Sequence, residues 1–338
     1  MRSCADNRSL ELGVARSLFV LITIATETGC IQMSLIQHFT RMGPTGFGFS
    51  STAESVTEGV ALAGRTILVT GTNTGLGRET MRVLALRGAH VIGTARTQAK
   101  ADAAAKMVGG AASGLVCELA DPQSVRACID AVAAMGVTLD AVICNAGIMA
   151  VPKLQLAHGY ELQFFTNHIG HFILVNGLVE HLADTGRVVM LSSSAHTGAP
   201  REGIQFDNLD GHQGYRPWKA YGQSKLANLL FAEELARRFA GTNRTANAVH
   251  PGVIRTDLAR GMNPLAKFAM SLASPVALKS VAQGAATQTF VATNDAIATV
   301  SGEYFADCNV ATPRADATDP FLAERLWDVS QGIVDALH

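Results

Sequence analysis

The sequence predicts an α/β fold in which a doubly wound parallel sheet is covered by helices on both faces. Three observations support this prediction: short apolar runs alternate with segments of helical periodicity, a glycine-rich turn follows the first run, and no internal repeat or linker interrupts the pattern after residue 60. The chain has 338 residues, of which 48% are hydrophobic and 16% charged. This composition provides a buried core and excludes disorder over most of the chain.

The first residues of the chain differ from the rest. Residues 1–59 lack sustained periodicity, and residues 42–51 are rich in Gly, Phe and Ser. We therefore expect an irregular N-terminal extension at residues 1–59, followed by a single domain at residues 60–338.

The only candidate targeting segment is an apolar run at residues 18–25. It is shorter than the roughly 20 residues that a membrane span needs. The acidic Asp6 and Glu11 precede it, which is atypical of a signal peptide. We expect no transmembrane segment, and we also expect translation to begin at Met33 or Met42, so that part of the extension is a mis-assigned start.

Six apolar runs are predicted to be short buried strands. The first, at residues 66–70, leads through the glycine-rich turn into a helix that ends at Arg87, before Gly88. Apolar residues at helical spacing predict a last helix at residues 320–337. The other predicted strands cover residues 90–94, 114–117, 141–144, 187–192 and 245–249. Because ligands of such sheets bind at the carboxyl ends of the strands, we expect the functional site there.

Charge and cysteine content limit the partners of the chain. Lys and Arg total 27 against 28 Asp and Glu, without a charge block that is typical of nucleic-acid binding. A small-molecule partner is therefore expected. The cysteines form no C-x-x-C pair, so we expect no disulfide framework, no zinc site and a reducing, cytoplasmic location. They are Cys4, Cys30, Cys117, Cys128, Cys144 and Cys308.

The glycine-rich turn, T-G-T-N-T-G-L-G at residues 70–77, predicts a phosphate-binding loop. Gly71 allows a tight turn, Gly75 lets the backbone approach a pyrophosphate, and Gly77 permits close packing of helix on strand. A tight strand-to-helix turn would also explain three glycines. Its place after the first strand of an alternating α/β pattern favours a Rossmann-type dinucleotide site.

A second motif predicts acid–base chemistry. Tyr221 and Lys225 lie four residues apart in a segment of helical periodicity, so that their side chains share one face. A phenol with a pKa near 10 is a poor catalyst at neutral pH. A unit charge about 4 Å away, at an effective dielectric near 20, is worth about 4 kcal/mol or about three pKa units. Lys225 can therefore prepare Tyr221 for proton transfer, although an isolated pair would be read as a buried aromatic and a surface charge.

The choice of cofactor is expected to depend on the residues after the second strand. The sequence G-T-A-R-T at residues 93–97 has no carboxylate to bind a ribose hydroxyl, and Arg96 offers a forked donor for a 2′-phosphate. NADP is therefore preferred, with NAD possible. The alternative is that Arg96 is a solvated surface residue.

Taken together, the motifs resemble the short-chain dehydrogenase/reductase family over about residues 60–330. Two segments, T-N-H-I-G-H-F at residues 166–172 and S-K-L-A-N at residues 224–228, resemble those of the branch of retinol dehydrogenases and WW-domain oxidoreductases. The motifs that carry the family resemblance are the glycine-rich turn, Asn145-Ala146-Gly147, Asn167, the serines at 192–194, Tyr221-x-x-x-Lys225 and Pro251-Gly252.

The resemblance implies a catalytic set of Asn167, Ser193, Tyr221 and Lys225. In the family the serine binds the substrate oxygen, the tyrosine transfers the proton, the lysine lowers the pKa of the tyrosine and binds the nicotinamide ribose, and the asparagine supports a proton-relay water. Ser193 is the match among the three serines, with a one-residue slip left open. The alternatives are purely structural roles. The serine hydroxyls would then form hydrogen bonds with backbone groups at the end of the strand, and Asn167 would bond to backbone where a helix is distorted.

The same resemblance implies the cofactor site. Glu118 stands where the family more often has Asp, and Cys144 replaces the more common Asn and is expected to be a small buried residue rather than a nucleophile. The implied cofactor-binding residues are Gly71, Asn73, Thr74, Gly75, Leu76, Gly77, Arg96, Glu118, Leu119, Asn145, Ala146, Gly147, Tyr221, Lys225, Pro251, Gly252, Val253 and Thr256.

No metal is expected. His168 and His171 lie three residues apart on a predicted helix, but no carboxylate or cysteine has ligand spacing with them. Hydrogen bonding from the helix face is the expected use of both. We expect His250, which precedes Pro251, to be a positioned loop residue.

These expectations combine into an NADP-dependent oxidoreductase that interconverts an alcohol and its aldehyde or ketone. The loop at residues 200–219 is long, and residues 258–274 carry Met262, Leu265, Phe268, Met270 and Leu272 with few charges, so they would select an apolar substrate as a lid. An amphipathic helix in the core, a second subunit or a membrane surface would explain these residues equally.

Two other functions fit the sequence less well. A non-catalytic NADP-binding regulatory or scaffolding protein is disfavoured by the complete catalytic set. A hydrolase is disfavoured because the chain has no G-x-S-x-G elbow and Ser193 has no evident base. The family also suggests a homodimer or homotetramer through the helices that contain Asn167 and Tyr221, unless those faces are core.

Overall fold

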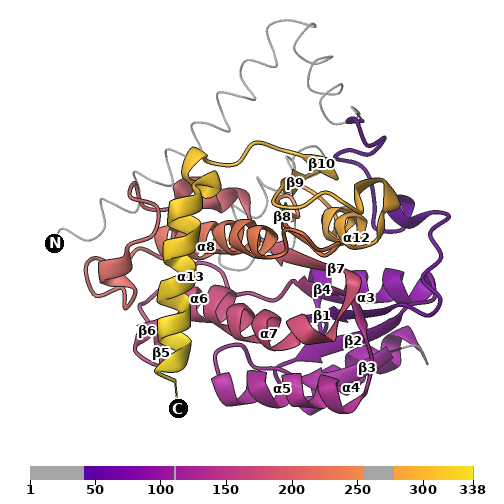
Figure 1. The fold of residues 1–338 in the computed structure, drawn as a ribbon, viewed down its shortest axis with the longest axis horizontal. Coiled ribbons are helices and arrows are strands. Elements are labelled where there is room, and N and C mark those ends of the chain that lie inside the picture. Colours follow the sequence, from indigo (N-terminus) through magenta and orange to yellow (C-terminus); the bar gives the residue numbers. More distant parts are fainter. Residues whose placement is uncertain (1–41, 110–111, 255–277, 338) are drawn as a thin grey trace, which may run out of the picture.

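The computed structural model describes residues 42–109, 112–254 and 278–337, which form one twisted sheet with helices on both faces (Figure 1). The strands are β1 (Thr66–Val69), β2 (His90–Ala95), β3 (Ala112–Val116), β4 (Leu139–Cys144), β7 (Leu182–Leu191), β8 (Thr245–His250), β9 (Tyr304–Ala306) and β10 (Asn309–Val310). Their order in the sheet is β10-β9-β8-β7-β4-β1-β2-β3, and only the β9–β10 pair is antiparallel. The predicted doubly wound fold is therefore confirmed.

The helices divide between the two faces of the sheet. On one face lie α5 (Pro122–Ala134), α7 (Gly170–Leu178), α8 (Pro217–Arg238) and α13 (Pro320–Asp335), and on the other lie α3 (Gly75–Leu86), α4 (Gln98–Val108), α11 (Val281–Gly284) and α12 (Ala286–Thr293). Leu68 of β1 packs into the first layer, whereas its neighbours Ile67 and Val69 pack into the second. Because successive side chains of a strand point to opposite faces and both faces are covered, the strands appear in the sequence as continuous apolar runs.

Short elements complete the chain. A two-stranded hairpin of β5 (Leu156–Ala157) and β6 (Tyr160–Glu161) lies outside the main sheet. A three-residue helix, α6 (Leu162–Phe164), runs into a π-helical turn, η2 (Phe165–Ile169), at the start of α7. The 3₁₀ turns are η1 (Ser55–Thr57), η3 (Val179–His181), η4 (Ser194–Gly198), η5 (Phe206–Asn208), η6 (Asp295–Ile297) and η7 (Ala315–Thr318).

The structure differs from the predicted elements at the edge of the sheet. The sequence does not predict β9 and β10, because strands of three and two residues are too short to form a distinct apolar run. β7 begins at Leu182 rather than at residue 187, and a register shift in its pairing with β4 accompanies the earlier start. The predicted terminal helix is confirmed as α13.

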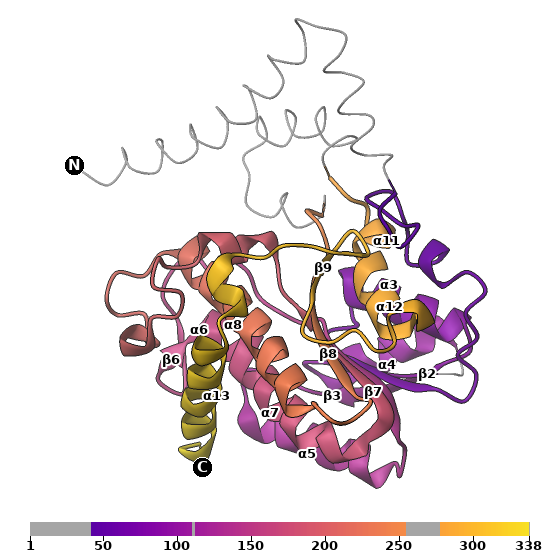
Figure 2. The ribbon, with the colours of Figure 1, turned by 45° about the horizontal axis from the view of Figure 1, so that its top comes forward.

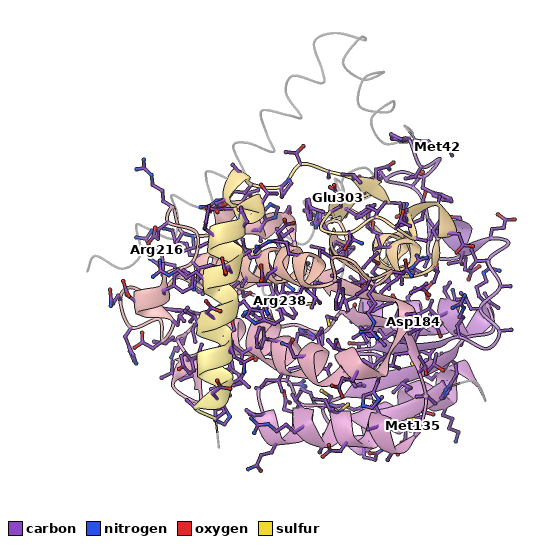
Figure 3. The ribbon with its side chains drawn as sticks, viewed as in Figure 1. Met42, Met135, Asp184, Arg216, Arg238 and Glu303 are labelled. Carbon is purple, nitrogen blue, oxygen red and sulfur yellow. The ribbon has the colours of Figure 1, made fainter. Side chains whose placement is uncertain are left out.

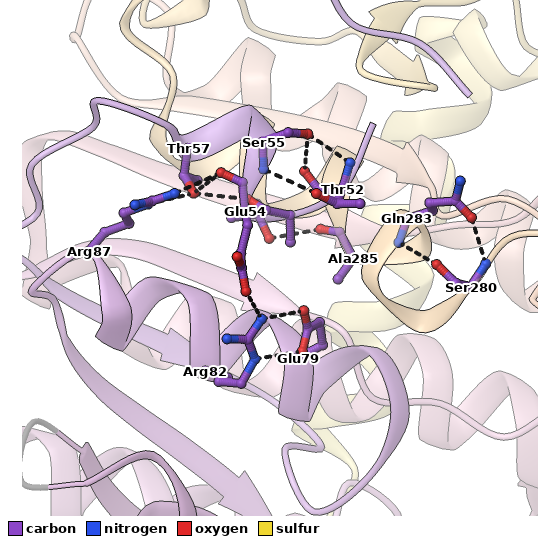
Figure 4. A network of polar contacts seen from close by, with 12 residues as sticks. Thr52, Glu54, Ser55, Thr57, Glu79, Arg82, Arg87, Ser280, Gln283 and Ala285 are labelled. Atoms are coloured by element: carbon purple, nitrogen blue, oxygen red, sulfur yellow. Dashed lines mark hydrogen bonds and ion pairs between the residues drawn. The ribbon is translucent and has the colours of Figure 1, made fainter. Parts of the chain in front are cut away.

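The N-terminal segment, residues 42–59, is irregular as predicted but packs on the domain. Ala53 N donates to Ala282 O (2.9 Å), and the ring of Phe47 meets that of Phe290 edge-on at 5.5 Å. Figure 4 shows Glu54 at the centre of a polar network, where its carboxylate pairs with Arg82 of α3 (2.5 Å). The start of the domain at residue 60 stays a prediction.

The C-terminal helix α13 lies beside α8 in both ribbon views (Figure 1 and Figure 2). Trp327 packs against the rings of Phe172 and Phe231 at 5.0 and 5.6 Å. Arg238, labelled in Figure 3, covers the outer face of Trp327 with its guanidinium 3.8 Å from the ring centre. Within residues 42–109, 112–254 and 278–337, no helix combines the length and hydropathy needed to span a bilayer.

Candidate active site

The glycine-rich turn between β1 and α3 has glycine where the backbone conformation or the packing disfavours a side chain. Gly71 and Gly75 have φ of 72° and 57°, a region that side chains disfavour. A Cβ on Gly77 would lie 2.3 Å from Gly71 O, whereas a Cβ on Gly75 would meet nothing within 4 Å among the described residues. The turn is therefore tight against the strand on one side and open on the other, as phosphate binding by the first amides of α3 requires.

Thr70, the residue before this turn, connects β1 with β4 and α7. Asn145 Nδ2 donates to Thr70 O (2.8 Å), and Ala146 N donates to Thr70 Oγ1 (2.9 Å). Thr70 Oγ1 is also 2.9 Å from His171 Nε2, and His171 Nδ1 is 2.9 Å from Asn167 O. Because a carbonyl oxygen only accepts, Nδ1 carries the proton and Nε2 accepts from the Thr70 hydroxyl. Burial lowers the pKa of His171 to about 4, which keeps the ring neutral.

Asn167 is fully buried in the π-helical turn η2, a kind of distortion that is common at functional sites. Its Oδ1 accepts from Ile148 N (2.8 Å), and its Nδ2 donates to Ile148 O (2.9 Å) and to Ser224 Oγ (2.9 Å). A Cβ on Gly147 would lie 3.0 Å from Asn167 Oδ1 and 3.5 Å from Lys225 Nζ. The bonding of Asn167 to backbone at a distorted helix is thus confirmed, and its side chain and that of Lys225 both lie next to Gly147.

Tyr221 and Lys225 share one face of α8, as their spacing predicts. Lys225 Nζ lies 5.8 Å from the centre of the Tyr221 ring and donates to Leu191 O (2.9 Å). Lys225 is 4% exposed, and burial lowers its pKa to about 8. The ammonium is therefore still protonated at neutral pH and lies beside the phenol ring.

Replacing Lys225 with Met is expected to stabilise the protein by about 1 to 3 kcal/mol at pH 7. The lowering of the pKa from 10.5 to about 8 means that folding disfavours the charged form by about 3 kcal/mol. Removal of the ammonium does not leave Leu191 O unpaired, because Asn228 Nδ2 also donates to it (2.9 Å). Urea unfolding at pH 7 and at pH 10.5 measures the effect.

The pH dependence of this difference has a fixed sign. Below pH 8 the lysine is charged in both states, so the full cost of its burial is present. Between pH 8 and 10.5 the unfolded chain binds more protons than the folded one, so the wild-type protein gains stability with pH and the advantage of Lys225→Met shrinks. The exposed Lys153, replaced by Met, provides the matched control and is expected to change stability by less than about 0.5 kcal/mol. A Lys225→Met protein less stable than wild type at pH 7 would contradict this account.

The three serines after β7 have different surroundings. Ser192 is 2% exposed, and its hydroxyl donates to Lys225 O (2.8 Å), which is the structural use expected for part of the cluster. Ser193 is half-buried with extended backbone, and its Oγ accepts from Ala195 N (3.2 Å). Ser194 is exposed. Ser193 therefore remains the candidate to bind a substrate oxygen.

The Pro251-Gly252 loop after β8 rests on a lysine that the sequence does not single out. Lys279 N donates to Val253 O (2.8 Å), and a Cβ on Gly252 would lie 2.5 Å from the Lys279 stem. Lys279 is fully buried, and its Nζ lies 2.5 Å from Asp307 Oδ1. The sequence does not show that Lys279 supports the Pro251-Gly252 loop, because the two segments come together only in the folded chain. Thr256 and the predicted lid at residues 258–274 lie outside the described residues.

The predicted adenosine end of the site lies after β2 and β3. Arg96 Nε is 4.0 Å from Glu118 Oε2, and the two side chains are 67% and 33% exposed. Glu118 Oε1 accepts from Ala120 N (3.3 Å). Leu119 is the next residue, and its carbonyl oxygen would lie 2.3 Å from a Cβ placed on Gly170. Arg96 is therefore accessible to a ligand, but the Glu118 carboxylate lies beside it.

The buried cysteine and the paired histidines behave as expected. Cys144 is fully buried at the end of β4, and burial raises the pKa of its thiol far above the ordinary value. His168 lies 2.8 Å from Ser330 Oγ of α13, and burial lowers its pKa to about 3. Among the described residues, no cluster of three or more His, Cys, Asp or Glu could hold a metal ion.

Taken as a whole, the described part of the site fits a dinucleotide. The glycine turn leaves open space at Gly75, Arg96 is exposed, and Lys225 and Tyr221 lie at the same edge of the sheet, at the carboxyl ends of its strands. Asn73, Thr74 and Leu76 belong to the turn and the start of α3. The residues predicted from distant parts of the sequence are thus brought to one edge.

Comparisons with known proteins agree with this geometry. The sequence model of the family "short chain dehydrogenase" matches residues 65–266. The chain is 42% identical over 313 residues to short-chain dehydrogenase TIC 32 B, chloroplastic, of Brassica napus, with 88% of this chain and 97% of that protein covered. It is 38% identical over 297 residues to human retinol dehydrogenase 14, with 81% and 87% covered.

Solved structures show the same fold. A crystal structure of an uncharacterized protein from Mycobacterium paratuberculosis is 35% identical, with a TM-score of 0.66 over 84% of this chain and 97% of that chain. A blue fluorescent protein from a metagenomic library, solved in complex with NADPH, is 25% identical, with a TM-score of 0.59 over 72% and 96%.

Proposed function

Because the chain belongs to the short-chain dehydrogenase/reductase family, we propose that it is an oxidoreductase that uses NADP to interconvert an alcohol and its aldehyde or ketone. The observation that carries the proposal is the buried Lys225 ammonium 5.8 Å from the centre of the Tyr221 ring, with Lys225 and Asn167 both next to Gly147. Neither a structural role nor a hydrolase requires a buried, protonated lysine at this place.

The residues have distinct roles in the proposed reaction. When bound, the nicotinamide supplies or accepts the hydride. Tyr221 donates a proton to the carbonyl oxygen during reduction and accepts it from the alcohol during oxidation. The Lys225 ammonium stabilises the phenolate charge that forms each time, and the Ser193 hydroxyl binds the substrate oxygen as its charge changes.

The cofactor would be held along the carboxyl edge of the sheet. The turn at residues 71–77 would bind the pyrophosphate, Arg96 the 2′-phosphate and Lys225 the nicotinamide ribose. Asn145, Ala146 and Gly147 would line the adenosine side, and the loop at residues 251–253 would support the nicotinamide. These assignments rest on the family and on the places of the residues in the fold.

Arg96→Ala is expected to weaken NADPH binding by about 10- to 100-fold and to leave NADH binding within about twofold, because a hydrogen bond to a charged group is worth about 1.5 to 3 kcal/mol. Fluorescence titration with both cofactors measures the two dissociation constants. Glu118→Gln, which removes the carboxylate 4.0 Å from Arg96, is expected to tighten NADPH binding. Equal weakening of NADPH and NADH binding by Arg96→Ala would contradict the preference for NADP.

An apolar substrate is favoured by exposed apolar side chains around the site. Trp218 is 55% exposed and lies edge-on to Tyr221 at 6.0 Å. Met149 follows Ile148, to which Asn167 is bonded, and Val253 follows Gly252; they are 40% and 43% exposed. Exposed apolar side chains next to polar site residues are typical of a site for an apolar molecule.

Incubation of the full chain with NADPH and a series of carbonyl compounds tests the function directly. Consumption of NADPH with apolar aldehydes or ketones, and not with small polar ones, is the expected result. Tight NADPH binding without turnover of any carbonyl compound or alcohol would overturn the proposal and favour a regulatory or scaffolding protein.

Location and assembly stay predictions from the sequence. The cysteine pattern predicts the cytoplasm, whereas the name of the Brassica napus relative places that protein in the chloroplast. A homodimer or homotetramer is predicted through the helices of Asn167 and Tyr221. Cell fractionation and sedimentation measure the two properties.

A further inference from the structure

The peptide bond between Ser193 and Ser194 is contacted at both edges by histidine rings. Ser193 O lies 2.6 Å from His196 Nδ1, and Ser194 N donates to His250 Nδ1 at 3.2 Å. The carbonyl oxygen and the N–H belong to the same planar peptide unit, so the two ring contacts act together with the backbone bond from His196 N to Ser193 O (3.0 Å) to fix its rotation. His196 lies in η4 and His250 ends β8, so the two rings come from different elements.

The hydrogen bonds of the two rings fix their protonation. His196 Nε2 accepts from Arg314 N (3.1 Å), so Nδ1 carries the proton and donates to Ser193 O. His250 Nδ1 accepts from Ser194 N, so its proton is on Nε2. Both rings are therefore neutral and have opposite tautomers. A second proton on His196 would place an N–H against the Arg314 N–H, and one on His250 would do the same against Ser194 N.

The surroundings of the rings favour this neutral state. His196 is 2% exposed and lies edge-on to Tyr304 at 5.2 Å, and burial lowers its pKa. Burial lowers the pKa of His250 to about 4. The charged groups that face the rings are Arg314 and Asp316 for His196, and Lys279 and Asp307 for His250. Each ring thus faces one cation and one anion.

We infer that His196 and His250 are positioning residues that hold the Ser193 side chain for the reaction by clamping the peptide that follows it. This inference rests on the proposed function, in which the Ser193 hydroxyl binds the substrate oxygen. Rotation of the peptide would move the Ser193 backbone and with it the hydroxyl, and a displacement of about 1 Å in such a group costs about 100-fold in rate. His196 also connects Ser193 to Arg314, whose guanidinium donates to Ala199 O (3.0 Å) and Pro200 O (2.7 Å).

Replacement by Phe and by Asn separates the hydrogen bonds from packing. His196→Phe and His250→Phe keep a ring but lose the hydrogen bonds of the imidazole, and each is expected to lower kcat by about 10- to 100-fold with KM and the NADPH dissociation constant within about threefold. His196→Asn restores a donor at the place of Nδ1, and His250→Asn restores an acceptor there. Both amide variants are expected to recover kcat to within about fivefold of wild type.

His90 provides a matched control, because it also forms a hydrogen bond with a serine but lies far from the site. His90 begins β2, at the opposite end of the sheet, and its Nε2 lies 2.9 Å from Ser113 Oγ. His90→Phe therefore loses one histidine–serine hydrogen bond, and its kcat is expected to equal that of wild type. If His196→Phe and His250→Phe also keep kcat within twofold, the positioning role is overturned.

A measurement without turnover tests the clamp apart from the proposed function. In the full chain with NADPH, the Ser194 amide proton is expected to exchange slowly in wild type and in His90→Phe, and at least tenfold faster in His250→Phe. Nitrogen chemical shifts are expected to show a proton on Nδ1 of His196 and on Nε2 of His250. Fast exchange in wild type, or the opposite tautomers, overturns the clamp. Absence of wild-type turnover with every carbonyl compound counts against the proposed function alone.

Discussion

Tyr221→Phe is expected to lower kcat/KM by about 100- to 10,000-fold, the range that a positioned acid or base contributes. The substitution removes only the phenol oxygen from a side chain that is 9% exposed, so the ring still fills its place beside Trp218. Lys225 keeps its bond to Leu191 O (2.9 Å) and remains available to a cofactor. The loss should therefore fall on the proton transfer, with the NADPH dissociation constant within about threefold of wild type.

The measurement is the rate of NADPH consumption with the best apolar carbonyl compound, together with a fluorescence titration of NADPH. Tyr160 of β6 provides a matched control, because it is half-buried, its ring stacks on Phe165 and it belongs to the hairpin outside the main sheet. Tyr160→Phe is expected to retain full activity. If Tyr221→Phe kept more than a tenth of the wild-type rate, another group would have to supply the proton and the proposed role of Tyr221 would be wrong.

Gly77→Ala is expected to abolish NADPH binding and to destabilise the protein by about 3 kcal/mol. The added Cβ would lie 2.3 Å from Gly71 O and 2.5 Å from Asn145 Nδ2, and the first of these is backbone. Insertion of one carbon into a packed site costs about 1 to 3 kcal/mol, and here α3 can move away from the strand only by deforming the turn. The amides that would bind the pyrophosphate move with it.

Gly332 of α13 offers the control for this experiment. It is also a helical glycine, but a Cβ there would meet nothing within 4 Å among the described residues. Gly332→Ala is expected to stabilise the protein by about 0.5 to 1 kcal/mol through its better helix propensity. Urea unfolding and NADPH titration are measured for both variants. NADPH binding by Gly77→Ala within threefold of wild type would show that this turn does not hold the phosphates.

The sequence is sufficient to predict six of the eight strands of the main sheet, because these strands are covered on both faces. Residues 67–69 and 141–144 are apolar without interruption, and such runs can be recognised in the sequence alone. β9 and β10 escape prediction because their pairing with β8 and with each other, rather than their own composition, makes them strands. The earlier start of β7 has a similar cause, since Leu182 pairs with Leu139 across a register shift.

The site is only partly readable from the sequence. The spacing of Tyr221 and Lys225 predicts their shared face, because four residues make about one helical turn. No spacing connects Lys279 to Gly252, or His196 to Arg314, since these pairs meet only when distant strands and loops come together. The hydrogen bond from the Ser192 hydroxyl to Lys225 O in α8 is likewise visible only in three dimensions.

The contact between Phe49 and Lys279 connects the N-terminal segment to the reaction centre. The Phe49 ring lies 5.2 Å from the ammonium of Lys279, whose stem fills the space beside Gly252. Removal of the N-terminal segment would expose this ammonium to water and leave Asp307 to hold the side chain that supports the Pro251-Gly252 loop. We therefore expect cofactor affinity to depend on a stretch of chain that precedes every strand of the sheet, so that trimming the protein to its sheet and helices would change its function as well as its structure.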